Sequence, residues 1–475
     1  MFIRLPLKFK IFIPLFLFAN LSNAQTNKGI SVWLTNGDRS ALFQQQSKQL
    51  NFTAEKKVDK KIMIDDTKTY QQMDGFGFAL TGGSAMHIIR MNANARNLLL
   101  HQLFDTTGNN IGVSYLRLSI GSSDLNEHPF SYDDMNGNET DTALVHFDLG
   151  EDKTDVIPVM KEILAINPNI KILGSPWSPP AWMKTNKDTR GGRLKPEYYS
   201  VYAKYLVKYI QQMYDAGIKI DAITIQNEPL HPGNNPSLLL VAPDEADFIK
   251  NYLGPLFRQN NISTKILIYD HNADRPDYPI SILNDADAKR YIDGSAFHLY
   301  GGTIDALTDV HDAHPDKNIY FTEQMVVQFN RKNKTNKGID ISYPINDLMI
   351  DAPRNWSKNV LLWNLAADPQ FKPYTDRGGC DMCQGAVTID KDSSFDNLAY
   401  YTMAHVSKFV RPGSFRIASN LLDSIPNVAY INPSGEKVLL VANISNQQQT
   451  FEIAYHHKST TAFLKPHSVA TYIWK

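Results

Sequence analysis

The chain has 475 residues, with 48 Lys or Arg against 49 Asp or Glu and a formal net charge of −1. Its 43% of hydrophobic residues is too high for a disordered chain, and the balanced charge gives no electrostatic attraction to nucleic acid. We therefore expect a folded protein with a sizeable core and no nucleic-acid partner.

The first segment has the pattern of a secretory signal peptide. Three basic residues up to Lys10 precede an apolar run over 11–21, and small residues follow up to Ala24. The alternative, a membrane anchor, is disfavoured because the run is too short to cross about 30 Å of hydrocarbon. We expect cleavage of residues 1–24 after Ala24, export to the periplasm or the cell exterior, and no stable membrane insertion.

Eight short runs rich in β-branched and aromatic residues alternate with helical patterns along most of the chain. The runs cover residues 76–81, 113–120, 170–176, 222–226, 265–269, 295–300, 319–322 and 360–365. Several are almost continuously apolar, which is typical of strands buried on both faces. The clearest helical pattern begins at Pro196 and stops at Gly217. Eight such units predict a (β/α)8 TIM barrel over 73–404.

The two ends of the chain have a different pattern. From 429 onwards, short strand-like runs are separated by turn residues with no helical pattern between them, and residues 30–70 alternate in a similar way. We expect segments 25–72 and 405–475 to form one small all-β sandwich outside the barrel.

Two carboxylates follow predicted barrel strands directly. Glu228 comes after the fourth run and Glu323 after the seventh, and barrels place active-site groups at the carboxyl ends of their strands. Taken singly, a Glu in such a position is more often a salt-bridge partner. A pair at one barrel mouth suits glycosidic bond cleavage, in which one carboxyl protonates the leaving oxygen and the other attacks or activates water.

A series of motifs in the same frame resembles glycoside hydrolase family 30, the retaining family of glucosylceramidases and β-1,6-glucanases. The series covers most of the chain beyond the signal segment. The motifs, in chain order, lie at 75–81 (Gly-Phe-Gly with Leu-Thr), 117–124 (Arg-Leu-Ser-Ile-Gly-Ser-Ser-Asp), 175–186 (Ser-Pro-Trp-Ser-Pro-Pro-Ala-Trp-Met-Lys-Thr-Asn), 226–230, 298–300, 322–323, 363–366, 405–410 and 412–414.

The resemblance implies catalytic roles for both carboxylates. Glu228 would be the general acid/base and Glu323 the nucleophile, while Asn227 would bind the sugar 2-OH. Glu228 must hold a proton near neutral pH, so we expect its surroundings, including the charge of Glu323, to raise its pKa. Arg117 would hold Glu323 ionised and oriented; the alternative is a purely structural ion pair, and both roles can coexist.

Further site residues follow from the same motifs. Trp177 and Trp363 would line the sugar pocket, although core packing is the commoner fate of a Trp. Tyr300 would bond an oxygen of the nucleophile, and His298, two residues earlier, faces the same side. The sequence shows no set of metal ligands at suitable spacing, so we expect neither a metal nor a cofactor.

The two cysteines, Cys380 and Cys383, form a lone C-x-x-C pair. Such a pair can be a redox motif, half of a zinc site or a local disulfide. The second half of a zinc site is missing, and no thioredoxin-like pattern surrounds the pair. For an exported protein we favour the short-loop disulfide.

One departure from the family bears on the substrate. Many glucosylceramidases carry an Asp directly after the first-strand Thr, where it clamps outer hydroxyls of the terminal glucose, whereas here Thr81 is followed by Gly82 and Gly83. We expect the missing clamp to leave an open corner that accepts a β-1,6-linked chain. The segment 226–236 also resembles the β-1,6-glucanase branch.

The sequence thus predicts a secreted retaining β-glycosidase that acts on a β-glucan or another β-glucoside, with endo-β-1,6-glucanase activity favoured. Within the class, β-glucosylceramidase or β-glucosidase activity is the alternative and xylan cleavage comes third. A different class, a non-catalytic glycan-binding protein on an enzyme fold, is disfavoured because both carboxylates are present.

Overall fold

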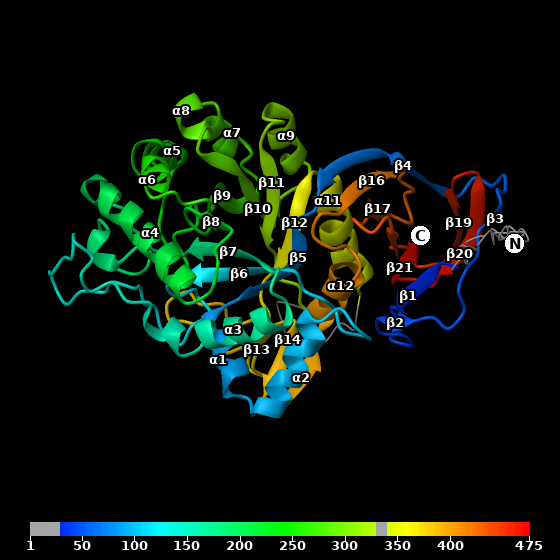
Figure 1. Ribbon diagram of the computed structural model, residues 1–475, viewed down its shortest axis with the longest axis horizontal. Coiled ribbons are helices and arrows are strands. Elements are labelled where there is room, and N and C mark those ends of the chain that lie inside the picture. The colour runs from blue at the N-terminus through cyan, green and yellow to red at the C-terminus, as the bar shows by residue number, and fades with distance from the viewer. Residues whose placement is uncertain (1–28, 329–339) are drawn as a thin grey trace, which may run out of the picture.

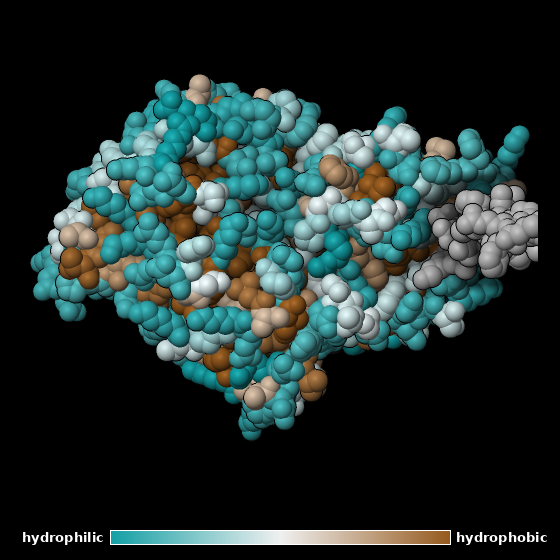
Figure 2. All heavy atoms as spheres, viewed as in Figure 1, coloured by the Kyte–Doolittle hydropathy of each residue, from teal (hydrophilic) through white to brown (hydrophobic). Residues whose placement is uncertain are grey.

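The computed structural model describes residues 29–328 and 340–475, so the expected signal peptide, 1–24, lies outside the described residues. Figure 1 shows two lobes, a barrel surrounded by helices and a β-sheet lobe that contains the C-terminus. Within the described ranges, no helix has the length and apolar character needed to cross a bilayer. Figure 2 shows hydrophilic residues over most of the same face, with smaller hydrophobic areas among them.

The barrel is a closed ring of eight parallel strands, which confirms the predicted fold class. Each of the eight runs found in the sequence overlaps one strand of the ring. The strands are β5 (Gly75–Leu80), β6 (Tyr115–Ile120), β7 (Lys171–Pro176), β8 (Ala222–Thr224), β9 (Lys265–Ala273), β10 (Ile292–Gly302), β11 (Asn318–Glu323) and β12 (Ser357–Leu362).

Helices cover the outside of the barrel (Figure 1). The α-helices of the described residues are α1 (Gly82–Arg90), α2 (Ala93–Phe104), α3 (Val156–Ile166), α4 (Tyr199–Asp215), α5 (Ala242–Phe248), α6 (Gly254–Gln259), α7 (Asp277–Leu283), α8 (Ala286–Lys289), α9 (Ala306–Ala313), α10 (Ser342–Pro344), α11 (Asp351–Arg354) and α12 (Leu398–Ser407). Shorter 3-10 turns are η1 (Gly150–Lys153), η2 (Ala181–Met183) and η3 (Pro196–Tyr198), and η4 (Ile249–Leu253) and η5 (Ile345–Ile350) are π-helical.

The interior of the barrel is filled by a layer of side chains from seven of its strands. One residue of each strand from β6 to β12 contributes: Tyr115, Leu173, Ala222, Leu267, Ala296, Tyr320 and Leu361. The remaining strand, β5, passes too close to β6 for a side chain, because a Cβ on Gly77 would lie 1.8 Å from the carbonyl oxygen of Tyr115. Side chains of a strand alternate between its faces, so residues two positions further on also point into the barrel, nearer its carboxyl end.

The second lobe is built from both ends of the chain, which confirms the predicted β-sandwich. Its strands are β1 (Ser31–Thr35), β2 (Gln44–Gln45), β3 (Thr53–Ala54), β4 (Lys61–Gln72), β16 (Phe415–Ser419), β17 (Asn427–Ile431), β18 (Lys437–Asn443), β19 (Gln449–Tyr455), β20 (Lys458–Leu464) and β21 (Ser468–Trp474). They form one sheet in the order β2-β1-β21-β18-β17-β16-β4-β19-β20-β3. Phe451 of β19 contacts Tyr472 of β21, which is not its neighbour in the sheet, so the sheet folds over a shared core.

A buried histidine connects the two lobes. His405, on α12, lies between Thr35 of β1 and Thr471 of β21: its Nε2 is 2.8 Å from the Thr35 hydroxyl and its Nδ1 is 3.0 Å from the Thr471 hydroxyl. A small third sheet, β13 (Ala366–Ala367), β14 (Val387–Asp390) and β15 (Ser393–Asp396), lies on the chain between β12 and α12. Through His405, helix α12 is thus bonded to strands from both ends of the chain.

Candidate active site

A layer of buried polar side chains lies directly above the apolar layer of the barrel. Arg117, Ser175, Thr224 and Thr322 each follow a residue of the apolar layer by two positions, so their inward direction follows from strand alternation. All four donate hydrogen bonds to one fully buried carboxylate, that of Asp270, at 2.6–2.8 Å. Burial alone would raise the pKa of Asp270, but the charge of Arg117, the hydrogen bond and charge of His298 and the hydrogen bond of Thr322 together hold it well below its ordinary value.

Asp270 reaches the barrel interior because β9 contains a bulge. Two residues after Leu267 of the apolar layer comes Tyr269, yet it packs outside the barrel against Phe297. The register with β10 passes from Tyr269 to His271 and skips Asp270, and both Tyr269 and Asp270 have positive φ, 75° and 54°. The extra residue turns the Asp270 carboxylate inward, where Arg117, Ser175, Thr224 and Thr322 donate hydrogen bonds to it.

Glu323, at the end of β11, is held by two donors from other strands. The Arg117 guanidinium donates to its Oε2 at 2.5 Å, and the hydroxyl of Tyr300 on β10 donates to its Oε1 at 3.0 Å. The same guanidinium also donates to Asn227 Oδ1 at 2.7 Å, which turns the amide nitrogen of Asn227 away from the cation. The structure thus brings the predicted nucleophile together with both predicted partners, Arg117 and Tyr300, and Arg117 also contacts Asn227.

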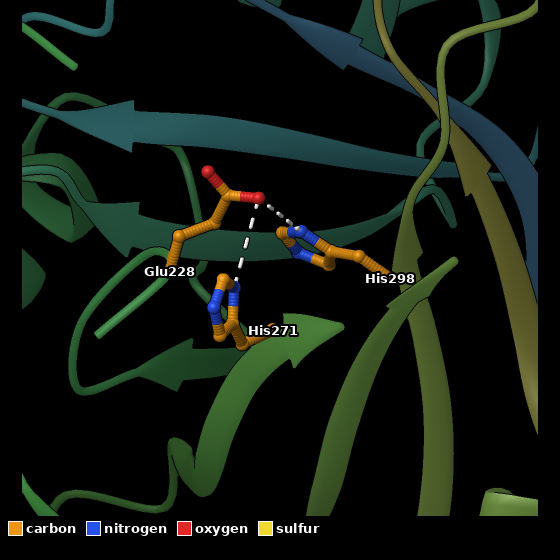
Figure 3. Close-up of side chains that lie close together, drawn as sticks. All are labelled: Glu228, His271 and His298. Carbon is orange, nitrogen blue, oxygen red and sulfur yellow. Dashed lines mark hydrogen bonds and ion pairs between the residues drawn. The ribbon is translucent and has the colours of Figure 1, made fainter. Parts of the chain in front are cut away.

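Glu228 lies in the turn after β8 and has a positive φ of 44°, an uncommon backbone conformation for Glu. Figure 3 shows its carboxylate facing two imidazoles. Its Oε1 is 3.4 Å from Nδ1 of His298 and 3.7 Å from Nδ1 of His271, while its Oε2 accepts a bond from Asn234 at 3.3 Å. The carboxylate of the predicted acid/base therefore faces side chains of strands β9 and β10.

His298 is fully buried between two carboxylates. Its Nε2 lies 3.1 Å from Asp270 and its Nδ1 faces Glu228. Burial by itself would lower the pKa of His298, but the charge of Glu323 and the hydrogen bonds with Asp270 and Glu228 outweigh it and raise the pKa to about 9. His298 is therefore an imidazolium at neutral pH in the unliganded protein.

The protonation of the two catalytic candidates differs from the expectation. Although burial alone would raise the pKa of Glu228, the hydrogen bonds and charges of His271 and His298 outweigh it, and the pKa is lowered below its ordinary value. Burial raises the pKa of Glu323 above its ordinary value, with the charges of His298 and Arg117 opposing and that of Glu228 adding. The sequence could not reveal this because the two imidazoles reach Glu228 from other strands.

The two predicted tryptophans lie together beside Arg117. The rings of Trp177 and Trp363 are 5.3 Å apart, and the Arg117 guanidinium lies 4.8 Å from the Trp177 ring centre, a cation–π contact. Both are buried, with 2% and 3% of their surface exposed, and they pack with Cys383. Cys383 forms a disulfide with Cys380, so the loop that carries the bridge supports the tryptophan pair.

The expected open corner at Gly82 is wrong. A Cβ at Gly82 would lie 2.1 Å from Nδ2 of Asn126, and one at Gly83 would lie 2.5 Å from the carbonyl oxygen of Leu125. The side chain of Asn126 fills the corner, and its Oδ1 accepts a bond from the backbone N–H of Ser123 at 2.9 Å. The glycines therefore allow the loop after β6 to pack against α1.

Three further charged or titratable residues belong to the site and were not found in the sequence. Asp270 and His271 directly follow the predicted fifth strand, and this position at a strand end is the signal that could have identified them. Asp124, in the loop after β6, is buried, and its burial together with the charges of Glu323 and Glu228 raises its pKa to about 8. Asp124 therefore carries a proton at neutral pH.

Among the residues that the structure describes, Glu228, His271 and His298 also have the arrangement of possible metal ligands, with their ligand atoms within 4.8 Å of one another. Chemically, the whole site offers a buried nucleophilic carboxylate with two donors, a second carboxylate beside a proton-bearing imidazole, and an amide beside both. This combination can cleave a glycosidic bond in two steps.

Two family models match the chain. The Glycosyl hydrolase family 30 TIM-barrel domain matches residues 73–410, and the family's beta sandwich domain matches residues 413–472. Together they cover the barrel and most of the C-terminal part of the sheet lobe.

Relatives and solved structures match over most of their lengths. Endo-1,6-beta-D-glucanase of Neurospora crassa is 38% identical over 367 residues, 74% of each protein. Lysosomal acid glucosylceramidase of Mus musculus is 28% identical, over 87% of this chain and 83% of the relative. The solved structure of the endo-beta1,6-glucanase BT3312 is 32% identical, with a TM-score of 0.85 over 94% of this chain and 99% of that one.

Proposed function

This chain belongs to glycosyl hydrolase family 30 and is a glycoside hydrolase, as the motif resemblance indicated, and we propose that it is an endo-β-1,6-glucanase. One observation carries the proposal. Three relatives named endo-1,6-beta-D-glucanase match at 32–38% identity, whereas the relatives named glucosylceramidase match at 28–30%. A solved endo-β-1,6-glucanase also shares the fold over nearly its whole length. The expected open corner at Gly82 no longer supports the proposal.

In the proposed first step, Glu323 attacks the anomeric carbon of the bound glucose and forms a glycosyl-enzyme. Arg117 and Tyr300 hold the attacking carboxylate in place, and their hydrogen bonds favour its ionised form. The leaving oxygen takes a proton from Glu228, and the amide of Asn227 donates to the 2-OH, a contact that strengthens in the oxocarbenium-like transition state.

The proton for this step passes from His298 to Glu228. In the unliganded protein the proton lies on His298, whose Nδ1 faces Glu228 across 3.4 Å. Transfer of that proton to Glu228 leaves both groups neutral, a state that becomes more favourable when the sugar replaces water in the site. Glu228 then gives the proton to the leaving oxygen. In the second step, Glu228 takes a proton from the water that hydrolyses the glycosyl-enzyme, and the β-configuration is retained.

A comparison of polysaccharides tests the substrate. Purified enzyme should release β-1,6-linked oligosaccharides, including gentiobiose, from pustulan, and should act much more slowly on laminarin, xylan and glucosylceramide. A Glu323→Gln preparation is the matched blank, because it keeps the shape of the site and removes the nucleophile. Release of glucose alone from chain ends, or faster cleavage of glucosylceramide than of pustulan, would replace this proposal with the glucosidase or glucosylceramidase alternative.

The stereochemistry of the product tests the two-step route. Proton NMR of early pustulan hydrolysis should show the β-anomer first, before mutarotation. Initial appearance of the α-anomer would mean that water attacks directly, and Glu323 would not be a nucleophile.

We also propose that the protein is exported with cleavage after Ala24, on the signal-peptide pattern of the sequence. Amino-terminal sequencing of protein recovered from the periplasm or the medium should begin at Gln25. Protein that stays in the cytoplasm with Met1 or residue 2 as its first residue would contradict export.

A further inference from the structure

We propose that Glu228, His271 and His298 form a binding site for a zinc-like divalent transition-metal ion. The three residues come from consecutive strands of the barrel: Glu228 follows β8, His271 is on β9 and His298 is on β10. In Figure 3 both imidazole rings are directed at the carboxylate of Glu228. Carboxylate and imidazole are ligands that zinc takes readily in proteins.

The distances between the three ligand atoms fit one ion. Ligands about 2.0–2.1 Å from a tetrahedral zinc ion lie about 3.3–3.4 Å from one another. Here Glu228 Oε1 is 3.4 Å from Nδ1 of His298 and 3.7 Å from Nδ1 of His271, and all ligand atoms lie within 4.8 Å of one another. Small side-chain movements therefore bring all three atoms to bonding distance.

The surroundings of both histidines prepare them for a metal. The Nε2 of His298 lies 3.1 Å from Asp270, and this carboxylate–imidazole pair fixes the ring with Nδ1 facing the cluster, as carboxylates do for histidines that ligate zinc. His271 is buried, with 7% of its surface exposed, and its Nδ1 makes only a long contact, 3.7 Å, with Oε1 of Glu228. The gap between this nitrogen and the carboxylate is close to the spacing of two ligands of one zinc ion, so an ion can bind between them.

The charge of the site favours a cation. Besides Glu228, the buried carboxyl groups of Asp270 and Glu323 are close by, and Arg117 is the fixed cation that contacts both of them. A divalent ion would displace the proton from Nδ1 of His298, because a ligating imidazole is neutral. It would bind through three ligands and keep a further coordination position for water or a sugar hydroxyl. Since Glu228 would then be a ligand, the bound metal would prevent it from delivering a proton, so the ion acts as a reversible inhibitor rather than as a cofactor.

Zinc titration of the purified enzyme tests the site. Isothermal titration calorimetry with Zn²⁺ alone should find one site in the wild type, and His271→Gln and Glu228→Gln should each weaken it by roughly tenfold or more. The matched control is His128→Gln, which removes an exposed histidine paired with Glu151 at 2.7 Å and should leave the site unchanged. Equal zinc affinity in wild type and His271→Gln, with both proteins folded by circular dichroism, would overturn the proposal.

Inhibition separates this inference from the proposed function, on which its inhibitory consequence depends. Zn²⁺ should inhibit hydrolysis of an aryl β-glucoside with the affinity measured by calorimetry, and EDTA should restore the metal-free rate. Each variant is compared with its own metal-free rate. Zinc that binds through His271 without inhibiting would support the site and count against Glu228 as acid/base. Inhibition that is as strong in His271→Gln as in the wild type would count against the site alone.

Discussion

His405 should make the stability of this protein fall in mild acid. Its two hydrogen bonds use the ring in one neutral form. The Thr471 hydroxyl donates to the backbone oxygen of His405, so it accepts from Nδ1–H, and the Thr35 hydroxyl accepts from the N–H of Phe43, so it donates to Nε2. A second ring proton would therefore meet a donor. Burial lowers the pKa of His405 from 6.5 to about 3 in the folded protein.

The size of the effect follows from these two values. Below pH 6.5 the unfolded chain binds a proton at His405, whereas the folded protein does not do so until the pH nears 3. Stability is therefore fully present above pH 6.5 and falls as the pH drops from 6.5 toward 3, by about 1.4 kcal/mol per pH unit once the unfolded histidine is charged. Between pH 7 and pH 5 the loss from this one residue is about 2 kcal/mol.

Urea unfolding at pH 7 and pH 5, followed by tryptophan fluorescence, isolates this contribution. A His405→Gln variant should be less stable than the wild type at pH 7 by about 1–3 kcal/mol, because its amide replaces the ring imperfectly. From pH 7 to pH 5 the gap should shrink by about 2 kcal/mol, because only the wild type loses the His405 contribution. The exposed control His128→Gln should follow the wild type at both values. A gap that stays constant would refute the neutral, buried assignment of His405.

Three other changes test the site. Glu323→Gln should abolish turnover of every substrate. Glu228→Gln should lose pustulan cleavage by about 10²–10⁴-fold but keep the first step on an activated aryl glucoside, with added azide restoring turnover. Equal loss of both activities in Glu228→Gln, without rescue by azide, would contradict the assigned roles. Cys383→Ser should lower the free energy of unfolding without removing activity from the folded fraction; a stable but inactive variant would contradict this. Gly82→Ala should lower the free energy of unfolding in urea by about 1–3 kcal/mol, because its Cβ would lie 2.1 Å from the side-chain amide of Asn126. An unchanged free energy of unfolding would show that the corner has room for a methyl group.

Much of the fold could be predicted because the barrel strands are buried on both faces. A strand such as 76–81 is apolar along nearly its whole length, and this pattern can be recognised in the sequence without knowing which strands lie beside it. The carboxylates of Glu228 and Glu323 were found in the same way, since each directly follows such a run. The arrangement of the two lobes was predicted from the change to short strands without helices.

The remaining parts of the site depend on contacts between distant strands. Asp270 enters the barrel through a bulge that breaks the alternation of β9, so counting from Leu267 places the wrong residue inside. The pKa of Glu228 is lowered by imidazoles from β9 and β10, and the corner at Gly82 is filled by Asn126 from the loop after β6. In each case the deciding neighbour is far away in the sequence, and only closure of the barrel brings it near.

Strand β21 lies between β1 and β18, so the sheet can be completed only after the last residues of the chain have been synthesised. While the ribosome is still making the C-terminal residues, β1 has already been synthesised, but its long partner does not exist. A chain that stops before Ser468 would hold every barrel strand, yet β1 and β18 would each present an unpaired edge, which is a template for aggregation. Late frameshifts and nonsense mutations should therefore produce insoluble protein rather than a shortened enzyme, even though they leave the catalytic barrel intact.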